Sequence, residues 1–175
     1  IMEAKSSRKI MTNPAPPITT DRLHLQPMTL EDAPHLYSLL SDKTHTRYLT
    51  IPTATDPKTV DDMTRVMVNT KGYCLWTLQS KDDGSFVGMC GFFNDSAVPN
   101  LVYSIAEDHK GRGYATEAAQ AAMPIGVKIL GIKTLELNTH GENKASQRVA
   151  EKLGFKKHTH YQHAYPQDPE PALVW

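Results

Sequence analysis

The stretch Lys110-Gly111-Arg112-Gly113-Tyr114-Ala115-Thr116-Glu117 lies between an apolar strand-like run, 101–106, and an alanine-rich run with helical spacing. Two glycines one residue apart allow backbone dihedrals that a Cβ forbids, and they let a ligand come close to the main chain. The first turn of the following helix points its unpaired amides and the positive end of its dipole at the same place. The stretch therefore predicts an anion site, and the anion is most often a phosphate.

Two other phosphate-binding loops fit this stretch less well. Thr116 occupies the third glycine position of a dinucleotide fingerprint, and the four residues 107–110 separate the strand from the first glycine, where a dinucleotide turn is tight. Glu136, an acidic residue about twenty positions further on, falls inside a strand rather than at its end. A P-loop is excluded because the chain contains no GxxxxGK. The alternative interpretation of residues 110–117 is an ordinary helix start, in which the glycines serve packing alone.

The bulk composition describes one globular domain. The chain has 175 residues, of which 39% are hydrophobic and 22% charged, and its formal net charge is zero. These are ordinary values for a soluble protein with a sizeable core. No net charge favours nucleic acid or a membrane, and no apolar run approaches a membrane span, so we expect a cytoplasmic protein with neither partner. Residues 1–17 are interpreted as a basic, proline-rich tail and 18–175 as a single domain.

Hydrophobic periodicity and turn signals predict the order of the elements. Strands are expected at 22–26, 73–79, 86–93, 101–106 and 134–139, with two more within 155–161 and 172–175. Helices are expected at 29–40, 57–68, 113–130 and 143–153. The strands at 73–79, 86–93 and 101–106 form an antiparallel meander, because short turns join them. The strand at 134–139 must run parallel to 101–106, because a whole helix intervenes.

Two expectations concern side-chain placement. Cys74 and Cys90 are expected as buried free thiols on opposite faces of the sheet, because an even-length loop pairs their strands in that way. The helix at 113–130 is expected to bury a stripe of small and branched residues, with Pro124 kinking it or loosening one turn. The stripe consists of Ala115, Ala118, Ala119, Ala122, Ile125 and Ile129.

The full pattern resembles the GNAT superfamily of acyl-CoA N-acyltransferases. The family signature Gln/Arg-x-x-Gly-x-Gly/Ala is matched by residues 110–115, with Lys110 where Gln or Arg is usual. Three further segments look like the branch that acetylates the N-termini of ribosomal proteins. They are Thr116-Glu117-Ala118, the stretch from Asn143-Lys144-Ala145-Ser146 to Glu151-Lys152-Leu153-Gly154-Phe155, and Thr20-Asp21-Arg22-Leu23-x-Leu25-Gln26-Pro27. The resemblance covers residues 18–175.

The resemblance implies an α/β fold with a mixed sheet of about six or seven strands and about four flanking helices. In that fold an antiparallel N-terminal meander leads to a central parallel pair, which splays around acetyl-CoA. The implied enzyme moves an acetyl group from acetyl-CoA to a primary amine by direct attack in a ternary complex. The acceptor is a protein N-terminus or a small molecule. The protein is a monomer or homodimer, and no metal takes part.

The resemblance also assigns residues to the site. Those implied to bind acetyl-CoA are Ser104, Ile105, Ala106, Lys110, Gly111, Arg112, Gly113, Tyr114, Ala115, Thr116, Asn138, Asn143 and Ser146. Ser146 is implied to protonate the leaving thiolate, and a purely structural place in the first turn of a helix capped by Asn143 is an equally good account of it. His140 lies near the splayed end of its strand and is a candidate base or acceptor contact.

Two of the family's usual catalytic groups are missing. The strand glutamate that deprotonates the amine in many relatives corresponds here to Asn100, which cannot act as a base, and the usual helix tyrosine corresponds to Ala150. An enzyme without that glutamate suits an amine of low pKa. A catalytically degenerate CoA-binding or interaction module is the rival reading, and a nicotinamide-binding enzyme is the third. His158, His160 and His163 could bind a metal, but surface histidines on a final strand are commoner.

Overall fold

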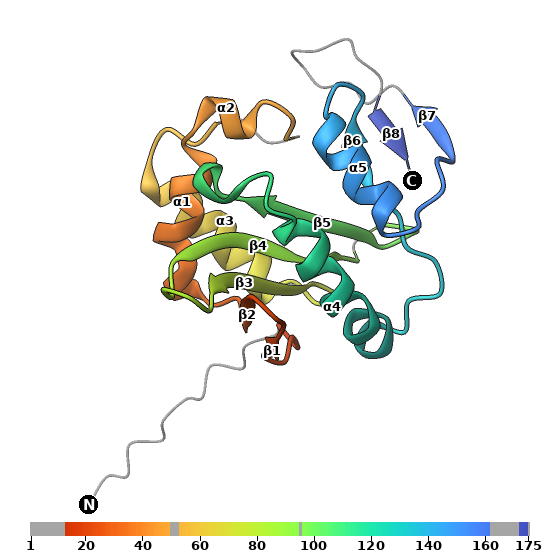
Figure 1. Ribbon diagram of the computed structural model, residues 1–175. Coiled ribbons are helices and arrows are strands. Elements are labelled where there is room, and N and C mark those ends of the chain that lie inside the picture. Colours follow the sequence, from red (N-terminus) through yellow and green to blue (C-terminus); the bar gives the residue numbers. More distant parts are fainter. Residues whose placement is uncertain (1–12, 50–52, 95, 162–171, 175) are drawn as a thin grey trace, which may run out of the picture.

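A five-stranded antiparallel sheet forms the centre of the molecule (Figure 1). The computed structural model describes residues 13–49, 53–94, 96–161 and 172–174. The strands lie side by side in chain order: β1 (Ile18–Thr19), β2 (Leu23–Pro27), β3 (Cys74–Ser80), β4 (Phe86–Phe93) and β5 (Asn100–Ile105). The predicted meander of β3, β4 and β5 is confirmed, and β1 is a strand that the sequence did not predict.

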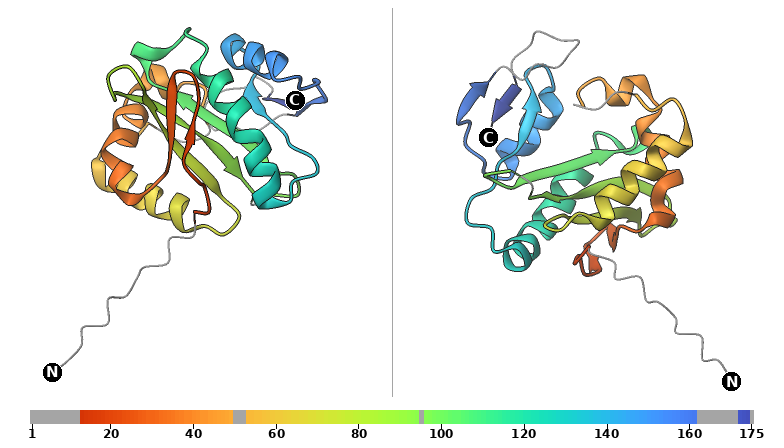
Figure 2. Two further views of the ribbon diagram at one scale, coloured as in Figure 1. Left: turned by 60° about the horizontal axis from the view of Figure 1, so that its bottom comes forward. Right: turned by 180° about the vertical axis from the view of Figure 1, so that it is seen from behind.

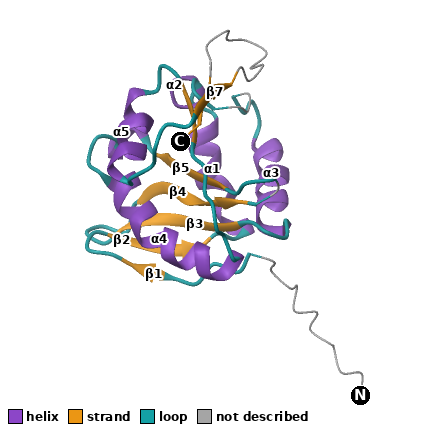
Figure 3. Ribbon diagram, turned by 90° about the vertical axis from the view of Figure 1, so that its right-hand side faces the viewer, coloured by secondary structure: helices purple, strands orange, loops and turns teal. Residues whose placement is uncertain are grey.

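Helices cover both faces of this sheet. α1 (Ala33–Leu40) and α3 (Pro57–Asn69) pack on one face, and α4 (Tyr114–Leu130) packs on the other, so that the strands lie between them in Figure 3. The remaining helical elements are η1 (Leu30–Asp32), α2 (Lys43–Thr46), η2 (Glu107–His109) and α5 (Lys144–Lys152). The four predicted helices are confirmed to within a few residues, and α2 was not predicted.

Alternation along β3 divides the core into two layers. Cys74, Trp76 and Leu78 are buried in the layer under α4, while Leu75 is buried in the layer under α1 and α3. Successive side chains of a strand point to opposite faces, so a central strand covered on both sides is buried at nearly every position. Several residues of the layer under α1 and α3 also line the cavity of the candidate site.

A β-bulge in the β3–β4 hairpin determines which side chains face α4. Val87 is the extra residue of the bulge and has no partner in the strand pairing. One extra residue turns the rest of β4 over relative to β3, and Trp76 consequently lies opposite Cys90. Cys74 and Cys90 therefore share one face, and the prediction of opposite faces was wrong. Both thiols are free and buried as expected, and burial raises the pKa of each to about 12.

The predicted parallel pair exists as a single bridge, after which the two segments diverge. Glu136 pairs with Asn100, where the Leu101 N–H donates to the Glu136 carbonyl (2.8 Å) and the Glu136 N–H donates to the Pro99 carbonyl (2.9 Å). Beyond the bridge the chain enters a second, antiparallel sheet of order β6-β8-β7. Its strands are β6 (Asn138–His140), β7 (Thr159–Tyr161) and β8 (Ala172–Val174). The strand predicted at 134–139 is thus shifted towards the C-terminus, and the splay is confirmed.

The buried stripe of α4 differs from the predicted one at its two ends. Its predicted members Ala118, Ala119 and Ala122 are fully buried, and Ala115 and Ile125 are partly buried. The prediction was wrong for Ile129, which is 38% exposed. Tyr114 and Gly126 are buried instead, and Pro124 lies within the helix on its exposed side. The helix therefore faces the sheet along a line that includes a glycine.

We expect that replacing Gly126 by valine destabilises the protein by about 3 kcal/mol, because overpacking a well-packed core costs this much. A Cβ at this position would lie 2.1 Å from a ring carbon of Phe92, whose fully buried side chain is held edge-on against Trp76. Thermal unfolding would measure the loss. The double variant with Phe92→Leu should recover part of it, because the ring is the obstacle. Equal destabilisation by Gln120→Val, on the exposed side of α4, would contradict this explanation.

Candidate functional site

The glycine turn is open to solvent and stands at the amino end of α4. Gly111 and Gly113 have left-handed backbone conformations (φ +73° and +82°), and Gly113 is the N-cap of the helix. A Cβ at Gly111 would meet nothing within 4 Å, and one at Gly113 would meet only a guanidinium nitrogen of Arg22, at 3.6 Å. The dihedrals of the turn require these glycines, whereas packing does not. The open space before the first helical amides suits an anion.

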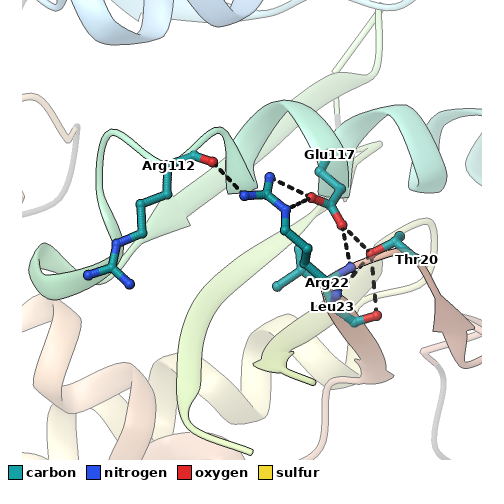
Figure 4. Close-up of polar contacts among 5 residues, drawn as sticks. All are labelled: Thr20, Arg22, Leu23, Arg112 and Glu117. Carbon is teal, nitrogen blue, oxygen red and sulfur yellow. Dashed lines mark hydrogen bonds and ion pairs between the residues drawn. The ribbon is translucent and has the colours of Figure 1, made fainter. Parts of the chain in front are cut away.

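A network of charged and polar groups fastens this turn to the start of β2 (Figure 4). The Glu117 carboxylate accepts hydrogen bonds from the Thr20 hydroxyl (2.6 Å), the Arg22 backbone N–H (2.9 Å) and Arg22 Nε (2.7 Å). Arg22 Nη2 lies 2.6 Å from the same carboxylate. Arg22 Nη1 donates to the Arg112 carbonyl (2.9 Å), and its guanidinium lies 4.6 Å from the centroid of the Tyr114 ring. The β1–β2 hairpin and the start of α4 are thereby joined (Figure 2).

The network keeps the carboxylate ionised and fixes the turn. Partial burial raises the pKa of Glu117, but the hydrogen bonds from Thr20 and Arg22 and the charge of Arg22 outweigh burial, so the pKa lies below its ordinary value. Because the Arg112 carbonyl accepts from Arg22, this polar group of the turn is already paired within the protein. Figure 4 shows the Arg112 side chain directed away from Glu117. The arrangement holds the glycine turn in a defined shape before any ligand arrives.

A cavity of about 1000 Å³ opens where β5 and β6 diverge. Polar side chains line the part next to the splay: Asn100, Ser104, Asn138, Asn143 and Ser146. Apolar side chains of α1 and α3 line another part of the cavity, over the face of the sheet that these two helices cover. Leu101 donates its N–H towards Glu136, so alternation turns the main-chain groups of Tyr103 and Ile105 towards the same open edge. An extended, amide-containing chain could pair with this edge and reach the cavity.

Comparison with known proteins identifies the family that has this arrangement. The model of the acetyltransferase (GNAT) domain matches residues 22–156. The chain belongs to the GNAT acetyltransferase family. An uncharacterized N-acetyltransferase, p20 of Bacillus licheniformis, is 29% identical over 144 residues, which are 79% of this chain and 81% of that protein. The resemblance inferred from the glycine turn is confirmed.

Two solved structures with bound coenzyme A show the same GNAT fold. The ribosomal L7/L12 α-N-protein acetyltransferase RimL, in complex with coenzyme A, matches with a TM-score of 0.79 and 18% identity over 91% of this chain and 96% of that one. Spermidine N-acetyltransferase from Vibrio cholerae, in complex with CoA and spermine, matches with a TM-score of 0.78 and 14% identity over 89% and 94% of the two chains. At these identities the likeness concerns the fold alone.

Ser146 lies in the first turn of α5 and faces the opening between β5 and β6. Its N–H donates to the side chain of the N-cap residue Asn143 (3.1 Å), and its Oγ shares a hydrogen bond with the Tyr103 hydroxyl at 2.8 Å. Burial raises the pKa of Tyr103 to about 12, and the hydrogen bond with Ser146 opposes this rise. The backbone of Ser146 thus serves the helix cap, its hydroxyl pairs with Tyr103, and the residue lines the cavity.

His140, the second predicted catalytic residue, lies apart from the cavity. Its side chain is only 1% exposed, and its ring centroid is 5.2 Å from that of Tyr48. Nδ1 accepts the backbone N–H of Glu142 (3.1 Å), which ties the ring at the end of β6 to the loop before α5. His140 is not among the residues that line the cavity. The structure brings Ser146 to the splay and keeps His140 within the protein.

The remaining predicted residues fall into two places. The side chain of Lys110 is paired with Glu107 beside the turn, and Asn138 donates to the side chain of Asn100 across the splay. Ser104 shares a hydrogen bond with Nε2 of His45 in α2, a residue that sequence reasoning did not single out. Burial and the nearby Lys110 lower the pKa of His45, with Asp42 and Glu107 acting in the opposite direction. His45 is therefore a neutral partner of the cavity wall at neutral pH.

Two features sought in the sequence are not seen in the described part of the chain. No group of three or more His, Cys, Asp or Glu side chains there is arranged to hold a metal ion, and His163 lies outside it. No helix there is long and apolar enough to cross a membrane. Arg22 and Glu117 were missed as members of the site, although both lie in segments that carried the family resemblance. Their contact joins positions 95 residues apart, so only the paired occurrence of Thr20-x-Arg22 and Thr116-Glu117 could have indicated it.

Proposed function

We propose that this GNAT protein transfers the acetyl group of acetyl-CoA to a primary amine, either a protein N-terminus or a small molecule. The observation that carries the proposal is the preformed glycine turn at the start of α4, which adjoins a strand edge that leads to a cavity. The fold neighbours that bind coenzyme A act on a ribosomal protein and on spermidine, and both acceptors present primary amines. Their names support an amine acceptor for this chain.

The chain offers one group of residues to each part of acetyl-CoA. The amides of 111–115, with Thr116 at the next position, would hold the pyrophosphate, and Lys110 and Arg112 would supply positive charge beside it. The main-chain groups of Tyr103 and Ile105 at the open edge would pair with the amide groups of the pantetheine arm. The predicted pairing by Ala106 was wrong, because its N–H donates to the Val87 carbonyl of β4 (2.8 Å). Asn138 and Asn143 lie on the opposite wall of the splay and would contact the arm near the thioester.

The chemistry requires one proton to leave the amine and one to reach the sulfur. A neutral amine attacks the thioester carbonyl and forms the C–N bond, and a backbone amide of β5 stabilises the oxyanion. The C–S bond then breaks, the nitrogen loses its extra proton to solvent water, and the thiolate takes up one proton. We assign Ser146 to protonate the leaving thiolate, with the Tyr103 hydroxyl restoring its proton. His140, buried at the end of β6, is assigned a positioning role for the loop that follows, through its hydrogen bond with the Glu142 N–H.

Asn100 influences which amine can react. It stands at the position of the family's glutamate base and cannot take a proton. A lysine side chain, with a pKa of about 10.4, costs about 3 kcal/mol more to neutralise at pH 7 than an α-amine with a pKa of about 8. The site therefore favours amines of low pKa. Faster acetylation of the ε-amine in matched peptides would contradict this assignment.

Calorimetry with acetyl-CoA, combined with thiol release over a panel of amines, tests the proposed function. We expect acetyl-CoA to bind and at least one amine to release CoA thiol. Binding without turnover on any amine would favour the rival reading, a CoA-binding module that has lost catalysis, for which Asn100 and Ala150 are the arguments. NAD or NADP binding in place of acetyl-CoA would favour a nicotinamide-dependent enzyme.

A further inference from the structure

The half of the cavity between the sheet and the helices α1 and α3 has an apolar wall. α1 contributes leucines, α3 contributes Met63, Val66 and Met67, and the sheet contributes Met89 and Phe93. The polar side chains described above lie next to the splay, where the thioester is expected. A pocket of this kind binds the apolar part of a ligand and orients its polar end by a few converging groups.

Charge is nearly absent from this wall. Asp62 is the one ionised side chain among the described residues that line the cavity. Its carboxylate is 2.7 Å from Nζ of Lys58, one helical turn earlier, and this pairing offsets its charge. A polycation loses its hydration when it enters a cavity, and it needs several carboxylates to pair with its charges, because burying an unpaired charge is costly. The described part of this wall has only the Asp62 carboxylate, so it cannot pair with the several charges of a polyamine.

The apolar wall contains flexible methionines, and Val66 lies at its entrance. Met63, Met67 and Met89 are unbranched and flexible, and such side chains adjust to ligands of irregular shape. Val66 is 61% exposed on α3 and also lines the cavity, so it lies where the cavity meets solvent. An exposed apolar residue at a cavity mouth favours the entry of an apolar ligand.

We propose that the acceptor is a small primary amine carried on an uncharged, apolar aliphatic or aromatic body, which binds between α1, α3 and the strands β4 and β5. The proposal rests on the proposed acetyl transfer, because it assigns the acceptor class of that same site. The cavity of about 1000 Å³ must also hold the acetylated end of the pantetheine arm. The room left suits a small molecule better than a folded partner, and the amine points to the polar splay while its body lies on the methionines.

Two matched comparisons test the acceptor class. Phenylalanine amide and leucine amide are compared with glycine amide, since all three present an α-amine of similar pKa. Phenethylamine is compared with spermidine. We expect kcat/KM to be about 10-fold or more higher for the apolar member of each comparison, which is the range that a few methylene contacts supply. A higher kcat/KM for spermidine or glycine amide would overturn the proposal and leave acetyl transfer itself intact.

Two valine variants locate the binding wall. Val66→Asp places a charge at the cavity mouth and should raise KM for phenylalanine amide about 10-fold, while acetyl-CoA affinity stays the same. Val127→Asp makes the same change at a valine that is 41% exposed on α4, away from the cavity, and should leave KM unchanged. Equal effects of the two variants would overturn the proposed location.

Binding of the amines to the CoA-saturated protein, measured by calorimetry, separates this proposal from the proposed function. If no amine is acetylated but phenylalanine amide binds at least 10-fold more tightly than glycine amide, the apolar site is supported and acetyl transfer fails. If amines are acetylated with no preference for apolar bodies, acetyl transfer is supported and the apolar site fails. Failure of every amine both to bind and to react would overturn both.

Discussion

Replacing Gly113 by glutamate is expected to weaken acetyl-CoA binding by about 100-fold or more, which corresponds to about 3 kcal/mol. The substitution puts a carboxylate at the amino end of α4, where the phosphates are expected to lie, so like charges meet in the site. Left-handed backbone (φ +82°) adds a cost of about 1–2 kcal/mol for any residue with a Cβ. Stability should fall by little more than that, because a carboxylate at a helix amino terminus is itself favourable. Calorimetric titration measures the affinity, and thermal unfolding measures the stability.

Gly131→Glu is the matched control for this variant. Gly131 stands at the other end of α4, is also left-handed (φ +63°), and has no atom within 4 Å of the Cβ position. The control therefore carries the same backbone penalty and the same charge, and it lies away from the turn. We expect its acetyl-CoA affinity to be that of the parent protein. Retained affinity in Gly113→Glu would mean that the turn is a structural feature only.

Local signals account for most of what the sequence predicted. Helix starts are marked by cap residues, and the structure confirms Asp56 before α3 and Asn143 before α5, whose side chains accept the expected backbone N–H groups. The hairpin turn at 81–84 and the glycine turn at 111–113 can likewise be predicted from neighbouring residues alone. These features arise from the chain within a few positions, so a sequence pattern is enough to find them.

The features that were missed depend on contacts between distant segments. The bulge at Val87 is marked in the sequence only by the adjacent Gly88 inside the strand, yet it reverses the face of every later side chain in β4. The bond between Arg22 and Glu117 and the burial of His140 exist only after the sheet and helices have packed. The apolar wall of the cavity is formed by residues of α1, α3 and β4, so no single stretch of sequence could have predicted that the wall is apolar. The family motif indicates where we propose that the donor binds, and tertiary packing forms the wall that we propose binds the acceptor.

Replacing Ser146 by alanine is expected to lower kcat about 100-fold, a typical effect of removing a general acid. The variant loses the hydroxyl that pairs with Tyr103 at 2.8 Å, but it keeps the backbone N–H that donates to the Asn143 cap. The free energy of unfolding should therefore change by about 1 kcal/mol or less. Steady-state kinetics with saturating acetyl-CoA and a low-pKa amine would measure the loss of turnover, and calorimetry should show unchanged acetyl-CoA affinity.

Two further variants distinguish a catalytic role of the Ser146 hydroxyl from a structural role in α5. Tyr103→Phe removes the hydrogen-bonding partner and retains the serine hydroxyl, so we expect kcat to fall less than in Ser146→Ala, by about 10-fold or less. Asn143→Ala removes the helix cap and should cost about 1 kcal/mol of stability. If Ser146→Ala keeps full turnover and unfolds at the reduced temperature of Asn143→Ala, the serine serves the helix alone. The proton for the thiolate would then have to come from Tyr103 directly or from water.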